Sequence, residues 1–276
     1  MKSELYKLQK AVKSIRKITD FEPEVCIVLG SGLGSLADYV DNPIVIPYGK
    51  IKYMPISTTS SHEGKLYFGI LGNTKVMLYK GRVHMYEGYS VEEVVRPIRL
   101  AGMLGAKKLI LTNSAGGINR DYKVGDVVLI KDFISSFVPS PHKGDIRRQI
   151  GSKLEFFDMT KVYSDDTYDT YDKIKEIGKI HGILFKEGVY LQVTGAQYET
   201  PAEIKFYERA GADLVGMSTV VEVIAGRHMN MEICAMSTVT NMAAGITGET
   251  LSHDEVKREG EIVAKKLGLV LIDLLK

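Results

Sequence analysis

The segment Val25-Cys26-Ile27-Val28-Leu29-Gly30-Ser31-Gly32-Leu33-Gly34 decides the fold of this 276-residue chain. Its first half is a continuous apolar run, which is typical of a strand that is buried on both faces. Its second half is a glycine-rich turn with an exposed hydroxyl, and the backbone N–H groups of such a turn can form a nest for an anion. A strand of this kind belongs to a sheet that helices cover, and the rest of the chain has to supply those helices.

Outward from this segment, strands and helices alternate along the whole length, without a linker and without a repeat. Further strands are predicted at 66–71, 75–79, 109–112, 126–134, 188–193, 214–217 and 233–240. Amphipathic spacing predicts a helix at 5–15, and residues 167–181 are also predicted to be helical. Helix-capping residues predict helix starts after Ser90, Thr200, Thr219 and Ser252. We therefore expect one α/β domain over residues 1–276, with a mixed, mostly parallel, twisted β-sheet flanked by helices.

The composition of the chain limits the kinds of partner and the compartment that we expect for it. The chain carries 36 Lys and Arg against 34 Asp and Glu, a net charge of +2, which gives no reason to expect nucleic acid or a membrane as its main partner. Cys26 and Cys234 both lie in apolar runs, and buried thiols indicate a reducing compartment. No Cys/His cluster has metal-ligand spacing, and no apolar run approaches the roughly 18 residues of a membrane span. We expect a cytoplasmic protein.

Polar and glycine-rich residues follow the predicted strands. They occupy residues 30–34, 113–117, 195–199, 216–219 and 241. Because ligands of open α/β sheets bind outside the carboxyl ends of the strands, we expect these segments to meet at one site. The turn at 30–34 does not complete a dinucleotide fingerprint, since Ser35 stands where the third glycine is required. A regulatory or oxidoreductase module that binds a nucleotide at this turn remains an alternative from a different class of protein.

The segment 81–90 holds the densest set of reactive side chains. Arg82, His84 and Tyr86 alternate, so in an extended backbone they point to one face and offer a guanidinium, an imidazole and a phenol. An oxyanion and a sugar hydroxyl suit that face. Glu87 falls on the opposite face of such a strand, which favours a structural role for it.

Two further positions suit a planar base. Tyr198 and Glu199 together offer a stacking face and a hydrogen-bond acceptor. Asn241 ends an apolar strand, where an amide is costly unless it has partners.

Taken together, these segments make the chain resemble a known family, the purine nucleoside phosphorylases of the trimeric type and their relatives that act on methylthioadenosine. The resemblance covers nearly the whole chain. It rests on seven motifs: Leu29 to Gly34, His62-Glu63-Gly64, Gly81 to Tyr89, Asn113 to Gly117, Tyr198 to Glu203, Gly216 to Val220, and Thr240-Asn241.

The resemblance implies an enzyme that cleaves a purine nucleoside with inorganic phosphate, without a metal or an organic cofactor. It implies phosphate binding by Ser31, His62, Arg82, His84, Ser114 and Ser218. It implies nucleoside binding by Tyr86, Tyr198, Glu199, Met217, Asn241 and His253. Within this set, His84, Glu199 and Asn241 are expected to take part in catalysis.

It also implies a substrate class and an assembly. Glu199 would accept the N1–H of a 6-oxopurine and Asn241 would donate to the base, which favours inosine and guanosine. A phosphorylase that prefers methylthioadenosine or xanthosine is the alternative. A homotrimer is implied, in which Phe156 or Phe157 closes the site of a neighbouring subunit.

Overall fold

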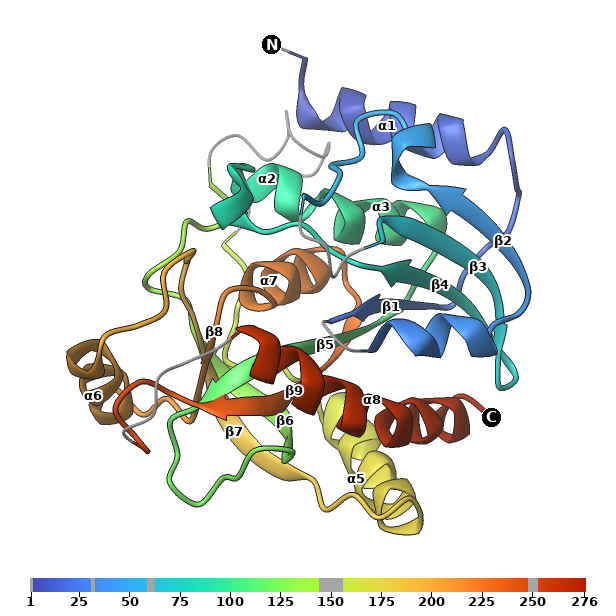
Figure 1. Ribbon diagram of the computed structural model, residues 1–276. Helices are drawn as coiled ribbons and strands as arrows, with labels where there is room; N and C mark the ends of the chain where they lie inside the picture. The colour runs from blue at the N-terminus through green and yellow to red at the C-terminus, as the bar shows by residue number, and fades with distance from the viewer. Residues whose placement is uncertain (1, 31–32, 59–62, 144–155, 248–252) are drawn as a thin grey trace.

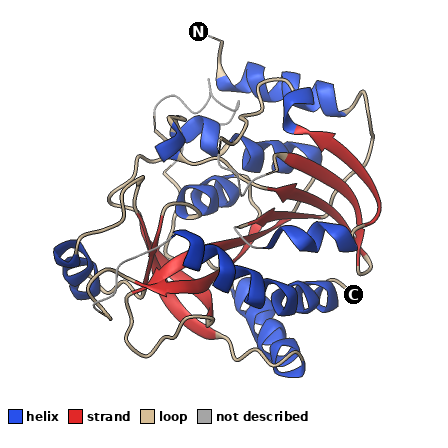
Figure 2. Ribbon diagram, viewed as in Figure 1, coloured by secondary structure: helices blue, strands red, loops and turns tan. Residues whose placement is uncertain are grey.

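The computed structural model describes residues 2–30, 33–58, 63–143, 156–247 and 253–276, without the side chains of 253–262. The described chain forms a nine-stranded sheet in the order β2-β3-β4-β1-β5-β8-β7-β6-β9 (Figures 1 and 2). The strands are β1 (Val25–Leu29), β2 (Asp41–Pro47), β3 (Lys65–Leu71), β4 (Thr74–Lys80), β5 (Lys108–Gly117), β6 (Val127–Ile134), β7 (Lys186–Gln192), β8 (Leu214–Gly216) and β9 (Glu232–Met242).

The sheet has an open part and a closed part. β5 pairs with β9 as well as with β1 and β8, so β5-β8-β7-β6-β9 returns on itself as a small barrel. Five of the nine described pairings are parallel, namely β1–β4, β1–β5, β5–β9, β6–β7 and β7–β8. The expectation of a mixed, mostly parallel sheet in an α/β protein is confirmed.

Helices cover both sides of this sheet (Figure 1). On one side lie α1 (Glu4–Ile15), α2 (Val91–Val94), α3 (Arg96–Leu104) and α7 (Val220–His228). On the other side lie α5 (Asp165–Ile180) and α8 (His253–Leu274), while α6 (Pro201–Arg209) stands at the barrel end. Short 3-10 helices occupy Leu33–Tyr39, Tyr48–Lys50 and Met85–Glu87.

Several local predictions are confirmed. β1 has the predicted bounds and every one of its residues is buried. The hairpin forms between β3 and β4. α2, α6 and α7 begin after Ser90, Thr200 and Thr219. α2 ends before Val95 and α3 restarts at Arg96 with Pro97 in its first turn, where a missing N–H costs nothing. The predicted cap at Ser252 lies outside the described residues.

Two predicted strand ends are wrong. Residues 113–117 and 241 lie inside β5 and β9, which run on past the predicted limits. The pairing of β5 with β9 continues to Gly117 and Met242, and β8 joins β5 at Gly116. Asn, Ser and Gly are poor strand formers, but hydrogen bonds from neighbours on both sides override that preference here. The polar residues are therefore held on a rigid sheet and not on loops.

Both cysteines are fully buried and free of disulfide bonds, as expected. Among the described helices, none combines the length and the apolar character that a membrane crossing requires.

Candidate active site

One cavity with about 740 Å³ of empty space, open to solvent, collects most of the predicted site residues. Its lining includes Arg82, His84, Tyr86, Ser114, Tyr198, Glu199, Met217, Ser218 and Asn241. Ser31 and His62 lie outside the described residues. His253 begins α8, but its side chain is not described. A concave cavity with convergent polar side chains suits a small-molecule ligand.

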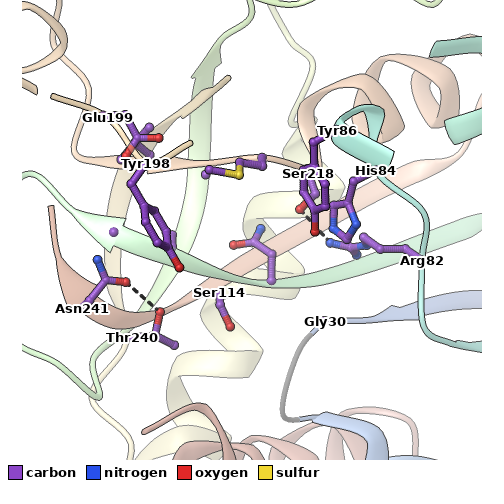
Figure 3. A pocket seen from close by; sticks show the side chains of 16 residues that line it. Gly30, Arg82, His84, Tyr86, Ser114, Tyr198, Glu199, Ser218, Thr240 and Asn241 are labelled. Carbon is purple, nitrogen blue, oxygen red and sulfur yellow. Dashed lines mark hydrogen bonds between the residues drawn. The ribbon is translucent and has the colours of Figure 1, made fainter. Parts of the chain in front are cut away.

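The sheet topology brings these residues together. β1, β4, β5 and β9 run parallel, so Gly30 and Arg82, which follow β1 and β4, lie near the carboxyl halves of β5 and β9. β8 approaches from the opposite direction, and its pairing of Val215 with Gly116 delivers Met217 and Ser218 to the same place. The cavity has two ends in Figure 3, with Ser114 between them.

The first end is cationic. Arg82 is 5% exposed, and its Nη1 donates to the Ser218 hydroxyl at 2.9 Å. Its Nε and Nη2 are buried and make no hydrogen bond. Burying guanidinium donors without acceptors is costly, so the geometry calls for an anion at this end.

The ring of His84 is fixed on two sides. Glu87 Oε1 accepts the backbone N–H of His84 at 2.8 Å and lies 3.1 Å from its Nδ1. Burial opposes ionisation of Glu87, but hydrogen bonds from His84 and Thr58 outweigh it and lower its pKa to about 2. An ionised carboxylate only accepts, so Nδ1 carries the ring proton. One face of the ring stacks on Tyr86, with ring centroids 4.6 Å apart.

The expected geometry of this segment is wrong in one respect. Met85–Glu87 is a 3-10 turn and not extended chain, so Glu87 contacts His84 and does not face away from it. The turn still directs Tyr86 into the cavity. Burial raises the pKa of Tyr86 to about 12, which keeps its hydroxyl protonated and able to donate.

The sequence pattern assigned no role in the site to four residues that support its cationic end, namely Asn113, Thr219, Glu222 and Ser237. Thr219 adopts a left-handed φ of 85°, and its N–H donates to Glu222 Oε2 at 3.1 Å. Its hydroxyl accepts from Asn113 Nδ2 at 2.8 Å, and Asn113 Oδ1 accepts from the Ser237 hydroxyl at 2.7 Å. Glu222 forms an ion pair with Arg82. The capping pattern at 219–222 was the available signal, but by itself it indicates only a helix start.

The second end carries the groups for a base. Figure 3 shows Tyr198, Glu199, Thr240 and Asn241 gathered there. The Thr240 hydroxyl donates to Asn241 Oδ1 at 3.2 Å, and Asn241 Nδ2 donates to the Met242 carbonyl at 3.1 Å. This orientation leaves the second hydrogen of Nδ2 as a donor. Burial, helped by the charge of Glu203, raises the pKa of Glu199.

The two candidate phenylalanines lie in different surroundings. Phe157 packs within its own chain against His142 and His228, with ring centroids 4.8 Å and 5.6 Å away. Phe156 is fully exposed. In the part of the chain that the structure describes, no group of three His, Cys, Asp or Glu side chains is arranged to hold a metal ion.

Known proteins are similar to this chain in sequence and in fold. Residues 24–276 match the model of the Phosphorylase superfamily, so the chain belongs to that superfamily. It is 40% identical over 257 residues to purine nucleoside phosphorylase 1 of Bacillus subtilis, covering 93% of both chains. It is 36% identical over 267 residues to purine nucleoside phosphorylase of Rattus norvegicus, covering 94% of this chain and 90% of the rat protein.

Solved structures agree. A purine nucleoside phosphorylase of Schistosoma mansoni in complex with inosine superimposes with a TM-score of 0.87 at 35% identity, covering 99% of this chain and 97% of that one. The same enzyme in complex with adenosine gives a TM-score of 0.86 at 36% identity, covering 99% and 98%. Within the superfamily, the chain is a member of the purine nucleoside phosphorylases.

Proposed function

We propose that the protein catalyses the reversible phosphorolysis of 6-oxopurine ribonucleosides and deoxyribonucleosides, such as inosine and guanosine. The products are the free base and ribose or deoxyribose 1-phosphate, a reaction of purine salvage. The observation that carries this proposal is one cavity with unpaired guanidinium donors of Arg82 at one end and the Glu199–Asn241 pair at the other. The names of the relatives support it.

Phosphate occupies the cationic end in this proposal. Arg82 offers Nη2 and Nε, Ser218 and Ser114 offer hydroxyls, and the Ser114 hydroxyl is buried without a partner. Ser31 and His62 are assigned to the same ligand by resemblance alone. His84 lies between phosphate and ribose, and Tyr86 and Met217 contact the ribose. Inorganic phosphate is then a co-substrate, and no other cofactor takes part.

The base occupies the other end, with Tyr198 stacked on it. Bond cleavage at C1′ leaves positive charge on the sugar and sends negative charge into the purine. Glu199 accepts the N1–H of a 6-oxopurine, and Asn241 Nδ2 donates to N7 or O6 as that charge develops. Because these contacts strengthen as the base departs, they accelerate cleavage and do more than bind substrate. His253 is assigned to the 5′-hydroxyl by resemblance.

A second specificity remains a candidate. The Schistosoma mansoni relative has been crystallised with adenosine as well as with inosine. A preference for methylthioadenosine or xanthosine would use the same cavity and the same phosphate.

The site is proposed to be completed by a second copy of the chain in a cytoplasmic homotrimer. Of the two phenylalanines, Phe156 is the one that can cross to a neighbour, because Phe157 packs inside its own chain.

The test is base release from inosine, guanosine, xanthosine and methylthioadenosine, each with and without phosphate. The proposal expects fast, phosphate-dependent release from inosine and guanosine. Release that ignores phosphate would contradict it, and so would tight NADH binding without cleavage, which would point to a nucleotide-binding module.

A further inference from the structure

Glu222 stands behind the phosphate end without being part of the cavity wall. It is the third residue of α7, and its side chain is 4% exposed, as is that of Arg82. Among the described residues, it is the one carboxylate that forms an ion pair with Arg82. A buried guanidinium needs a nearby negative charge, because an uncompensated buried cation is strongly destabilising.

The two charged groups form an ion pair without a hydrogen bond between them. Glu222 Oε1 lies 3.6 Å from Arg82 Nε, which is too long for a hydrogen bond. A carboxylate free to move would close on Nε and Nη2 as a bidentate partner. Here those two nitrogens remain without a hydrogen bond. Glu222 therefore compensates the charge of Arg82 without accepting a hydrogen bond from it.

A hydrogen bond to the backbone explains why the Glu222 carboxylate does not move closer to Arg82. Glu222 Oε2 accepts the N–H of Thr219 at 3.1 Å. Thr219 is itself held by Asn113 through its hydroxyl and has a left-handed φ of 85°. A non-glycine residue persists in that conformation only where its surroundings impose it. The turn thus holds the carboxylate at charge-pairing distance.

We propose that Glu222 is the counter-charge of Arg82 in the phosphate-free enzyme and that it weakens phosphate binding. This inference rests on the proposed function, because it takes phosphate as the ligand of Arg82. When a phosphate dianion binds, it neutralises Arg82 in place of Glu222, and the two negative charges then repel each other across the guanidinium. The carboxylate stabilises the empty site and favours release of phosphate and of the sugar 1-phosphate product.

The decisive variant is Glu222→Gln. The amide oxygen still accepts from Thr219, but the charge is gone. We expect the KM for phosphate to fall about three- to tenfold, as expected from removing one partly screened like charge. The KM for inosine should stay within about twofold of wild type. Without phosphate the variant should melt several degrees lower than wild type, and saturating phosphate should narrow that difference.

A merely structural or positioning role for Glu222 predicts the opposite sign. A rise in the phosphate KM of Glu222→Gln would overturn the proposal, and so would an unchanged phosphate KM. Glu93→Gln is the matched control, since Glu93 holds the same third position in the capping box of α2 and does not line the cavity. It should lower the melting temperature and leave the phosphate KM unchanged.

Two further outcomes apply if Glu222→Gln does not fold without phosphate. If Glu222→Gln folds only in phosphate buffer, that dependence supports the proposal. If it folds in neither buffer, Glu222→Asp replaces it: the charge is retained, so a phosphate KM within threefold of wild type supports the counter-charge and a rise of tenfold or more overturns it. Wild-type protein whose melting temperature ignores phosphate would instead contradict the proposed function itself.

Discussion

At the scale of single residues, the direction in which each side chain donates or accepts decides the chemistry. Asn241 is oriented by Thr240, so its free hydrogen can serve the base. Asn241→Asp replaces that donor with an acceptor, which repels a 6-oxo group and attracts a 6-amino group. We expect activity on inosine to fall and the ratio of adenosine to inosine turnover to rise. Steady-state kinetics on both nucleosides measure the ratio, and an unchanged ratio would remove Asn241 from base recognition.

Glu199 is predicted to matter more for turnover than for binding. If Glu199 accepts a hydrogen bond from the base as proposed, that contact strengthens as the base leaves, so Glu199→Ala should cost several orders of magnitude in kcat/KM on inosine. Thermal unfolding should change little, because a raised pKa in the folded state means that burial opposes the charge of Glu199. Single-turnover kinetics separate the effect of the variant on bond cleavage from its effect on substrate binding. A loss below tenfold, about 1.4 kcal/mol, would contradict the assignment.

Glu87 gives a prediction with a defined pH window. Its pKa is lowered to about 2 in the folded protein, below the value of about 4.3 of an unfolded glutamate. Its charge therefore stabilises the fold above roughly pH 4.3, and this contribution is lost as the pH falls toward 2. Glu87→Gln should lower the free energy of unfolding at pH 7, and the difference from wild type should shrink between pH 4.5 and the lowest pH at which wild type still folds.

Urea unfolding at pH 7, 5, 4 and 3 measures that trend. Glu176→Gln, on the exposed face of α5, is the control and should stay within about 0.5 kcal/mol of wild type throughout. A gap for Glu87→Gln that is independent of pH would show that the charge is irrelevant. The sequence predicted a structural role for Glu87 but not its contact with His84, because alternation places Glu87 on the far side of an extended chain, whereas Met85–Glu87 is a turn.

At the scale of helices and strands, local signals predicted beginnings better than ends. Capping residues fixed the starts of α2, α6 and α7, since a hydroxyl and a carboxylate three residues apart satisfy local donors wherever the chain goes next. β5 and β9 continued through Asn, Ser and Gly because distant strands pair with them. The pairing of Gly116 with Val215 joins residues far apart in the sequence, so no local sequence pattern predicts it.

The cap of α6 should also serve the base end of the cavity. Thr200 Oγ1 accepts the N–H of Glu203 at 3.2 Å, and Tyr198 and Glu199 directly precede it. Thr200→Ala should cost about 1 kcal/mol of stability. It should also raise the KM for inosine a few-fold, because the residues before the cap lose their anchor.

Ser3→Ala is the matched control for that variant. Ser3 caps α1 by accepting the N–H of Tyr6 at 3.3 Å, and α1 does not line the cavity. It should show a similar loss of stability with an unchanged KM for inosine. Equal KM effects in the two variants would mean that the base end responds to general destabilisation.

At the scale of the whole molecule, one chain builds both ends of the cavity from segments more than 150 residues apart, Arg82 to Asn241. The polar residues placed after predicted strands indicated which segments would meet. The sequence could not predict the barrel closure through β5 and β9, which puts Ser114 between the two ends. Nor could it choose between Phe156 and Phe157, whose difference lies in packing against His142 and His228.

That difference gives the last prediction. The ring of Phe156 is fully exposed within its own chain. Phe156→Ala should therefore leave the unfolding free energy of an isolated subunit unchanged. If the ring covers a neighbour's nucleoside, the same variant should raise the KM for inosine at least several-fold while its phosphate KM stays constant. Phe157→Ala should instead lower stability, because it removes packing against two imidazoles.

Light scattering on both variants measures the state of assembly. Mixing Phe156→Ala subunits with Glu199→Ala subunits tests directly whether Phe156 reaches the site of a neighbouring subunit. In mixed assemblies an intact Phe156 can cover an intact Glu199 site, so the KM for inosine of the mixture should move toward the wild-type value. A KM that stays at the Phe156→Ala value after verified subunit exchange would place Phe156 outside the neighbouring site.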